Sequence, residues 1–169
     1  KKLPKGSFLS NKDLPPKVSS SILKDKKGRS FRLVGVPDLV VKFTNGEYGI
    51  IDFKTTKLSA QKANFYKFQL EAYATIFEKP GKINSIETPL LEPVTKLAIM
   101  QFDPDRIDNM NEIGCNIVFI MGYVELESRI TDELFDRVSY ALDILESDNP
   151  PPLNPNCNDC NFVIKQNNI

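Results

Sequence analysis

"GVPDLVVKFTNGEYGIIDFKT", residues 35–55, is the stretch of this chain of 169 residues from which the centre of the fold can be predicted. The stretch is mostly apolar and β-branched, which predicts two strands, and an Asn-Gly pair between such runs is the strongest short signal for a β-hairpin. Charged residues interrupt both strands, Asp38 in the first and Asp52 and Lys54 in the second. The pairing register of the hairpin determines where these three side chains point.

The length of the turn sets that register. A two-residue loop at Asn45-Gly46 would place Asp38 opposite Phe53 and would mix polar and apolar side chains on both faces of the sheet. A three-residue loop that starts at Thr44, with Gly46 in the left-handed conformation, places Asp38 opposite Asp52 instead. We prefer the second register because it separates the two classes. One face then carries Leu39, Val41, Phe43, Ile51 and Phe53, and the other carries Asp38, Asp52 and Lys54 beside Val36, Val40 and Ile50.

Two directly opposed carboxylates repel each other, and a divalent cation between them removes the repulsion. Carboxylate oxygens suit Mg²⁺, which keeps several waters and needs few protein ligands. Lys54 beside the pair can hold an anionic group or orient a water, and this combination indicates phosphodiester hydrolysis. In the alternative interpretation Asp38 and Asp52 are solvent-facing turn or edge residues, and Lys54 forms a surface ion pair with Asp52.

The rest of the chain predicts an α/β fold with a mixed central β-sheet flanked by helices. Residues 24–28 read as a turn, and aromatic and aliphatic residues at helical spacing between residues 59 and 79 end at Pro80-Gly81. Thr131 is expected to cap the last helix, which has acidic residues in its first turn. The expected strands are 21–24, 31–43, 47–56, 95–102 and 115–127, and the expected helices are 59–79 and 131–147.

We expect one domain, at residues 21–149, between a basic flexible arm at residues 1–20 and a Pro-rich tail with a cysteine pair at residues 150–169. Charge is unevenly distributed, since residues 1–67 carry fifteen Lys and Arg against five Asp and Glu, and residues 68–169 carry seven against seventeen. This asymmetry indicates either solvated lysine-rich loops or a basic face for phosphates.

Hydrophobic residues make up 41% of the chain, which is ordinary for a globular protein. No apolar run approaches the roughly 18 residues of a membrane helix, so we expect no membrane partner. The chain shows no secretory signal and its three cysteines form no even disulfide framework, which favours a reducing, intracellular (cytoplasmic) setting. The first residue is Lys1 rather than Met, as in a fragment of a longer protein.

Three blocks in order, "GVPD", "IIDFKTT" and "FQLEAYA", resemble the PD-(D/E)XK nuclease superfamily, in particular its RecB-type branch, which includes the CRISPR-associated exonucleases. The resemblance extends from about residue 20 to residue 165. It implies a restriction-endonuclease-like core and a metal-dependent nuclease that hydrolyses DNA. It also implies DNA as a partner, and a larger nuclease, helicase or CRISPR-type assembly as a further one.

The resemblance also assigns roles to residues. Asp38 and Asp52 would bind a catalytic Mg²⁺ or Mn²⁺, with the carbonyl of Phe53 as a further ligand. Lys54 would position the attacking water or stabilise charge in the transition state. Gln69 and Tyr73, four residues apart on one helix face, would line the site.

The chain departs from the family pattern in two ways. Members of the branch supply a His or Glu from an upstream helix, but this chain has no His, and its only acids before Asp38 are Asp13 and Asp25. Related enzymes also carry an iron–sulfur cluster, whereas here only Cys157 and Cys160 form the C-terminal pair and Cys115 reads as a packed thiol. Two thiolates are too few for a four-ligand site, so we expect no cluster. The alternatives to an enzyme are a catalytically degraded domain that binds nucleic acid or acts as a scaffold in a larger protein, and a plain structural domain.

Overall fold

A five-stranded sheet organises the computed structural model, which describes residues 5–10, 12–111 and 114–149. Parallel pairing joins β10 to β7, and every other neighbour in the sheet is antiparallel, so the prediction of a mixed sheet is confirmed. The strands follow the order β1 (Gly6–Phe8), β6 (Leu39–Phe43), β7 (Tyr48–Thr55), β10 (Val94–Asn111) and β11 (Gly114–Glu125).

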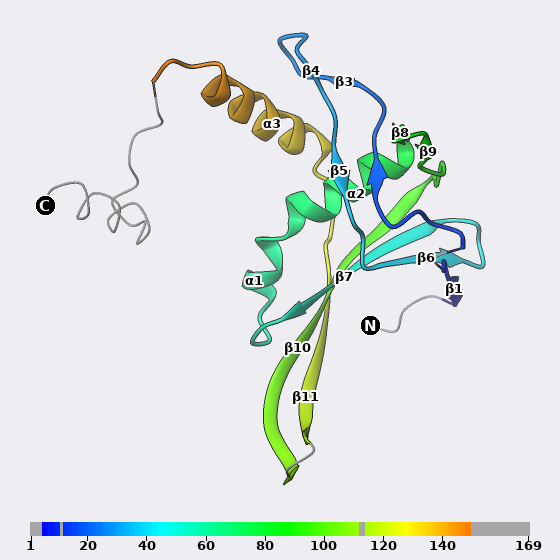
Figure 1. Cartoon of the computed structure of the whole chain (residues 1–169), viewed down its shortest axis with the longest axis vertical. Coiled ribbons are helices and arrows are strands. Elements are labelled where there is room, and N and C mark those ends of the chain that lie inside the picture. The colour runs from blue at the N-terminus through cyan, green and yellow to red at the C-terminus, as the bar shows by residue number, and fades with distance from the viewer. Residues whose placement is uncertain (1–4, 11, 112–113, 150–169) are drawn as a thin grey trace, which may run out of the picture.

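Helices cover one face of this sheet (Figure 1). The predicted helix at residues 59–79 is divided into α1 (Ala60–Asn64) and α2 (Lys67–Glu78), with an interruption at Phe65-Tyr66. α2 packs on β7 and β10, and α3 (Thr131–Leu145) packs on α2. The core between α2 and the sheet contains Val40, Ile50, Leu70, Ala74, Phe77, Leu97 and Ile99.

The hairpin β6–β7 has the predicted register. Leu39 faces Ile51 and Lys42 faces Tyr48, which continues to the pairs Phe43–Glu47 and Asp38–Asp52. The backbone N–H of Phe43 donates to the Glu47 carbonyl at 2.8 Å, and Gly46 has φ +88°. The three-residue loop is therefore confirmed, because glycine occupies its left-handed position without a Cβ penalty.

The long strand predicted at residues 31–43 is wrong. The chain there has three successive partners, with β4 (Ser30–Phe31) pairing to β3 (Leu23–Lys24), β5 (Val34–Gly35) to β2 (Val18–Ser19), and β6 to β7. Pro37 lies between β5 and β6 and has no N–H for a ladder. The predicted turn at residues 24–28 does join an antiparallel pair, with Gly28 at φ +80°.

Part of the segment that we expected to be a flexible arm belongs to the fold. Gly6–Phe8 forms the edge strand β1 on β6, and Val18, Ser19 and Ser20 are fully buried. The expectation of a free arm is thus corrected for the described residues 5–10 and 12–20. Main-chain pairing holds these residues despite their lysines and prolines.

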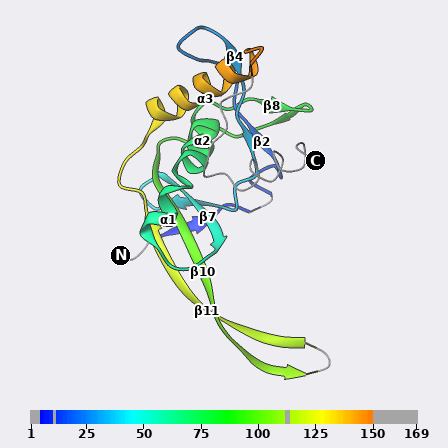
Figure 2. The same ribbon diagram turned by 90° about the vertical axis from the view of Figure 1, so that its left-hand side faces the viewer.

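The strand β10 extends far beyond its predicted end at residue 102, whereas β11 lies within two residues of its predicted bounds, and together they form a hairpin that leaves the body of the protein (Figures 1 and 2). Asp and Pro residues in β10 hid this extension, since both are depleted in strands. Its pairing contains irregularities next to Pro104 and Asp108. The short strands β8 (Lys82–Ile83) and β9 (Ile86–Glu87) form a separate small hairpin in what was predicted to be a loop.

A buried ion cluster fixes the start of α3. Glu71 on α2 is fully buried and accepts hydrogen bonds from the Arg129 guanidinium at 2.8–3.0 Å and from the Thr131 hydroxyl at 2.7 Å. The prediction of Thr131 as the N-cap is therefore wrong, because Ile130 occupies that position and the Thr131 hydroxyl bonds to Glu71 instead.

Within the described ranges, no helix has the length and apolar character needed to cross a membrane. The predicted tail with Cys157 and Cys160 lies outside the described residues. Cys115 lies in β11, as predicted.

Candidate active site

The hairpin register brings Asp38 and Asp52 together. Asp38 directly precedes β6, and Asp52 lies within β7 and is 1% exposed. Hydrogen-bonded and non-hydrogen-bonded pairs alternate along antiparallel strands, and Phe43–Glu47 and Leu39–Ile51 are pairs of the hydrogen-bonded kind. Asp38–Asp52 is therefore a non-hydrogen-bonded pair, the kind whose side chains lie closer together. The predicted convergence of the two carboxylates is confirmed by this register.

Asp38 also replaces a backbone group in the ladder. Its Oδ2 accepts the N–H of Phe53 at 2.8 Å. In the continued register Pro37 would face Phe53, and proline has no N–H to donate to the Phe53 carbonyl. The N–H and C=O of one strand residue point to the same side, so the carbonyl of Phe53 is directed to the side where Asp38 lies.

Gln69 and Tyr73 connect α2 to the same carboxylate. The Gln69 Nε2 donates to Asp52 Oδ1 at 3.1 Å and to the Tyr73 hydroxyl oxygen at 2.9 Å. The Tyr73 hydroxyl donates to the carbonyl of Val36 at 3.0 Å. The chain of hydrogen bonds therefore runs from β7 through α2 to the segment just before Pro37, and all five side chains expected in the site lie in one region.

Lys54 lies on the Asp52 side of the sheet. Its ammonium is 2.5 Å from Asp52 Oδ2 and 4.7 Å from the centre of the Tyr66 ring. Sequence reasoning missed Tyr66, which lies at the interruption between α1 and α2 and packs against the core. Tyr66 lies three residues before Gln69 at the start of α2, so the helical spacing that placed Gln69 and Tyr73 on one face could have found it.

The electrostatics of Asp52 are those of a buried acid. Burial raises its pKa above the ordinary value, the Lys54 ammonium opposes the rise, and the Asp38 carboxylate adds to it. The Asp52 Oδ2 is buried, and although the Lys54 ammonium is close, it does not meet this oxygen at a hydrogen-bonding angle. Ion pairing depends little on angle, so Lys54 and Asp52 form an ion pair at this distance even without a directed hydrogen bond.

These oxygens fit a hard divalent cation. Two carboxylates and a main-chain carbonyl are the donor types that Mg²⁺ prefers, and Mg²⁺ is held by one or two carboxylates together with waters and substrate phosphates. The buried Asp52 Oδ2 without a directed hydrogen bond is the observation that supports the fit. Among the described residues no cluster of three or more His, Cys, Asp or Glu could hold a metal, so a cation here would depend on these two carboxylates.

Neither acid upstream of Asp38 joins this pair. Asp13 accepts hydrogen bonds from the backbone and side chain of Ser10 in an exposed turn. Asp25 is buried, and although burial works to raise its pKa, hydrogen bonds from Arg29 and Ser139 lower the pKa to about 2. Asp25 therefore holds the β3–β4 hairpin on α3. No acid from residues 5–10 and 12–37 occupies the upstream position of the site.

Part of the basic excess is neutralised inside the fold. Lys26 pairs with Asp136, Lys27 pairs with Asp143 at 2.7 Å, and Arg29 also pairs with carboxylates of α3. The opposite charges of the two halves of the chain thus hold the β3–β4 hairpin against α3. The exposed Lys57 and Lys62, just beyond β7, are the basic residues closest along the chain to Lys54.

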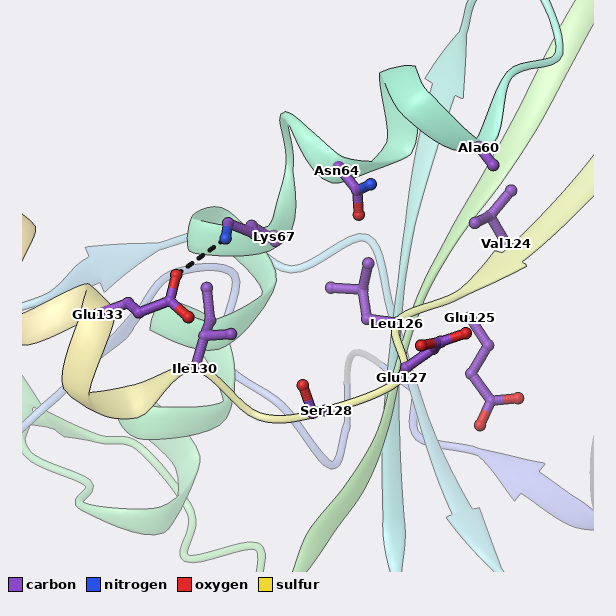
Figure 3. A pocket seen from close by; sticks show the side chains of 10 residues that line it. All are labelled: Ala60, Asn64, Lys67, Val124, Glu125, Leu126, Glu127, Ser128, Ile130 and Glu133. Carbon is purple, nitrogen blue, oxygen red and sulfur yellow. Dashed lines mark hydrogen bonds and ion pairs between the residues drawn. The ribbon is translucent and has the colours of Figure 1, made fainter.

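A pocket of about 530 Å³ lies on the Asp52 face of the sheet but at its far edge, beside β11 (Figure 3). Its lining includes Glu125, Glu127 and Glu133, and Lys67 donates to Glu133 at 2.9 Å across it. Glu133 pairs with Lys67 and Glu125 with Lys96, but the lining still carries three glutamates against one lysine, so this pocket does not suit the substrate backbone. A smaller pocket of about 230 Å³ includes Pro37 and Asp38 in its lining, but not Asp52.

Comparison with known proteins gives one match. A family model described as the PD-(D/E)XK nuclease superfamily matches residues 9–164. No curated protein and no solved structure matches the chain.

Proposed function

The chain belongs to the PD-(D/E)XK nuclease superfamily, and from this premise we propose that it is a metal-dependent nuclease that hydrolyses phosphodiester bonds of DNA. Its mixed sheet with helices on one face is consistent with a restriction-endonuclease-like core, as predicted. The single observation that carries the proposal is the pairing of buried Asp52 with Asp38 beside the ammonium of Lys54.

Each residue has a role that its contacts support. Asp38 and Asp52 would hold Mg²⁺ or Mn²⁺ together with the Phe53 carbonyl. The bound cation would supply positive charge that polarises the phosphate and acidifies a water. Gln69 keeps Asp52 in one orientation through its hydrogen bond to Oδ1, and Tyr73 fixes Gln69 in turn.

Lys54 is the group that acts on the substrate. Its ammonium pairs with Asp52, and with a cation bound at the two carboxylates it would be free to contact a phosphate oxygen or the attacking water. The Tyr66 ring limits where that ammonium can move, because a cation over an aromatic face is held there by the ring quadrupole. Positive charge placed where negative charge develops is a large contribution to catalysis.

We place the chain in the RecB-type branch, within a larger nuclease, helicase or CRISPR-type assembly. The hydrogen bonds of Gln69 and Tyr73 to the site support this placement, since these residues carry the resemblance to that branch.

A second function has one observation in its favour. This function is that of a catalytically degraded domain that binds nucleic acid or acts as a scaffold. Such a domain is expected to lack the upstream acid, and neither Asp13 nor Asp25 supplies it here. Against it, the opposed carboxylates raise each other's energy, and a site without a cation has no reason to keep that cost.

A cleavage assay separates the two. The purified chain is incubated with end-labelled single-stranded and double-stranded DNA in Mg²⁺, in Mn²⁺ and in EDTA. The proposal expects cleavage in at least one metal, none in EDTA, and none from Asp52→Asn. DNA binding without cleavage in either metal would support the degraded domain.

A further inference from the structure

The corner between α1 and α2 forms a pocket with an unusual lining. The pocket measures about 370 Å³ and lies between this corner and α3. Phe65 at its rim is 76% exposed. A single exposed Phe needs no explanation, but this one borders a hollow that also contains a second ring, two cations and two amides. The lining consists of Gln61, Asn64, Phe65, Lys67, Phe68 and Arg137.

The cations are organised around the second ring. The Phe68 ring centre lies 5.1 Å from the Lys67 ammonium and 4.7 Å from the Arg137 guanidinium. Lys67 is also paired with Glu133 at 2.9 Å, whereas Arg137 forms no ion pair with any carboxylate of the described residues. Arg137 is therefore a positive charge that is held in place by stacking and remains available to an anion.

This pocket adjoins the candidate active site. Tyr66 touches Lys54 and Gln69 bonds to Asp52, so residues 66 and 69 face the site, while the neighbouring Phe65 and Phe68 line the pocket. Adjacent residues of a helix point about 100° apart, so the two locations lie on neighbouring sides of the same helix turn, whose diameter with side chains is about 10–12 Å. A strand with one phosphate at Lys54 can therefore place an adjacent base in the pocket.

The start of α1, which leads to the corner, is held to the sheet by hydrogen bonds. Gln101, 1% exposed, accepts the N–H of Ser59 and donates to the Ser59 carbonyl, both at 3.0 Å. The Ser59 hydroxyl then caps α1 by accepting the N–H of Lys62 at 3.2 Å. Gln101 is the register partner of Lys54 in the parallel pair, so the same sheet position anchors both the start of α1 and the lysine.

We propose that this pocket binds an unpaired nucleobase of the strand whose phosphate lies at Asp52 and Lys54. The inference rests on the proposed nuclease function and adds the form of its substrate, a single strand or a frayed end. Phe65 stacks on the base, and Arg137 pairs with a neighbouring phosphate. Every base has an aromatic face, so the site accepts all four bases. A base paired within a duplex has both faces covered by its neighbours and cannot enter.

The test measures binding in EDTA, so that it does not depend on cleavage. Fluorescence anisotropy at low salt compares a labelled oligothymidine with the same strand made entirely of abasic nucleotides. Wild-type protein is expected to bind the oligothymidine roughly tenfold to a hundredfold more tightly than the abasic strand. Phe65→Ala is expected to lose most of this difference, and Phe65→Trp to keep it.

Phe8→Ala is the matched control, because Phe8 is 68% exposed on β1 and lies outside the pocket. It is expected to leave the preference unchanged. Thermal melting should show Phe65→Ala as stable as wild type, since the side chain that it removes is largely exposed.

Several outcomes would overturn the inference. These are equal wild-type affinity for the two strands, an undiminished preference in Phe65→Ala, tighter binding of duplex than of the single strand, or no binding at low salt. Failure of the nuclease proposal looks different, because cleavage in Mg²⁺ or Mn²⁺ would then be absent while the preference for bases in EDTA persists.

Discussion

Replacing Lys54 by alanine distinguishes a catalytic lysine from a structural one. The side chains of Lys54 and Asp52 are 22% and 2% exposed and lie 2.5 Å apart, so the pair is more buried than an ordinary surface ion pair. Removing one partner of a buried pair costs about 3–5 kcal/mol. Because Lys54 is partly exposed, water can replace some of its interaction, and we expect Lys54→Ala to lower the free energy of unfolding by about 2–3 kcal/mol at neutral pH.

The same substitution should have a larger consequence for catalysis. If the ammonium contacts the phosphate or the attacking water, the rate of DNA hydrolysis falls about a hundredfold or more, which corresponds to about 2.7 kcal/mol of transition-state stabilisation. Hydrolysis is measured under single-turnover conditions, well below the melting temperature of the variant, so that the loss of stability does not appear as a loss of rate.

Two further variants separate the effects. The double variant Asp52→Asn/Lys54→Ala removes the unpaired charge and should recover stability but no activity. Lys57→Ala, exposed just past β7, should change the rate by less than about threefold. If Lys54→Ala cleaves DNA within about threefold of the wild-type rate, the catalytic role of Lys54 is refuted.

Three other substitutions have defined outcomes. The free energy of unfolding of Asp52→Asn in urea, relative to that of wild type, should increase as the pH rises from about 4 to about 8. The reason is that the pKa of Asp52 is raised in the folded state, so the wild-type protein loses stability as this carboxyl ionises. Arg129→Met should cost about 3–5 kcal/mol at neutral pH by leaving buried Glu71 unpaired. Burial works to raise the pKa of Glu71, but hydrogen bonds from Arg129 and its neighbours outweigh it and lower the pKa. Wild type should therefore lose stability as the pH falls below about 4.5 and Glu71 is protonated, and Arg129→Met should lose less. Gly35→Ala places a Cβ inside van der Waals contact of the Tyr73 ring and should cost about 1–3 kcal/mol by thermal melting, with slower cleavage; an unchanged melting temperature would contradict the packing described.

The sequence predicted the centre of the fold well because local chemistry determines it. Gly46 can adopt the left-handed conformation of a three-residue loop, and the separation of polar from apolar side chains then leaves one register. The approach of Asp38 to Asp52 follows from that register alone. Gln69 and Tyr73 were expected on one helix face, and the structure brings both to Asp52.

The parts that sequence reasoning missed depend on long-range partners. Whether residues 31–43 form one strand depends on which segments pair with them, and β2, which pairs with β5, is too short to leave a periodic signal. Thr131 has the residue type of a helix cap, but the buried Glu71 from another helix takes its hydroxyl. Tyr66 was missed for a different reason, since it shares the α2 face of Gln69 and Tyr73 and helical spacing could have placed it near Lys54.

If Asp38 and Asp52 form a cation site, calorimetric titration with Mn²⁺ should detect it. Wild type should bind Mn²⁺ more tightly as the pH rises, because binding displaces the proton that the raised pKa of Asp52 favours. Asp38→Asn and Asp52→Asn should each lose this binding, and Asp13→Asn, in its exposed turn, should keep it. Binding that is equal in all four proteins, or absent from wild type at every pH, would contradict the account.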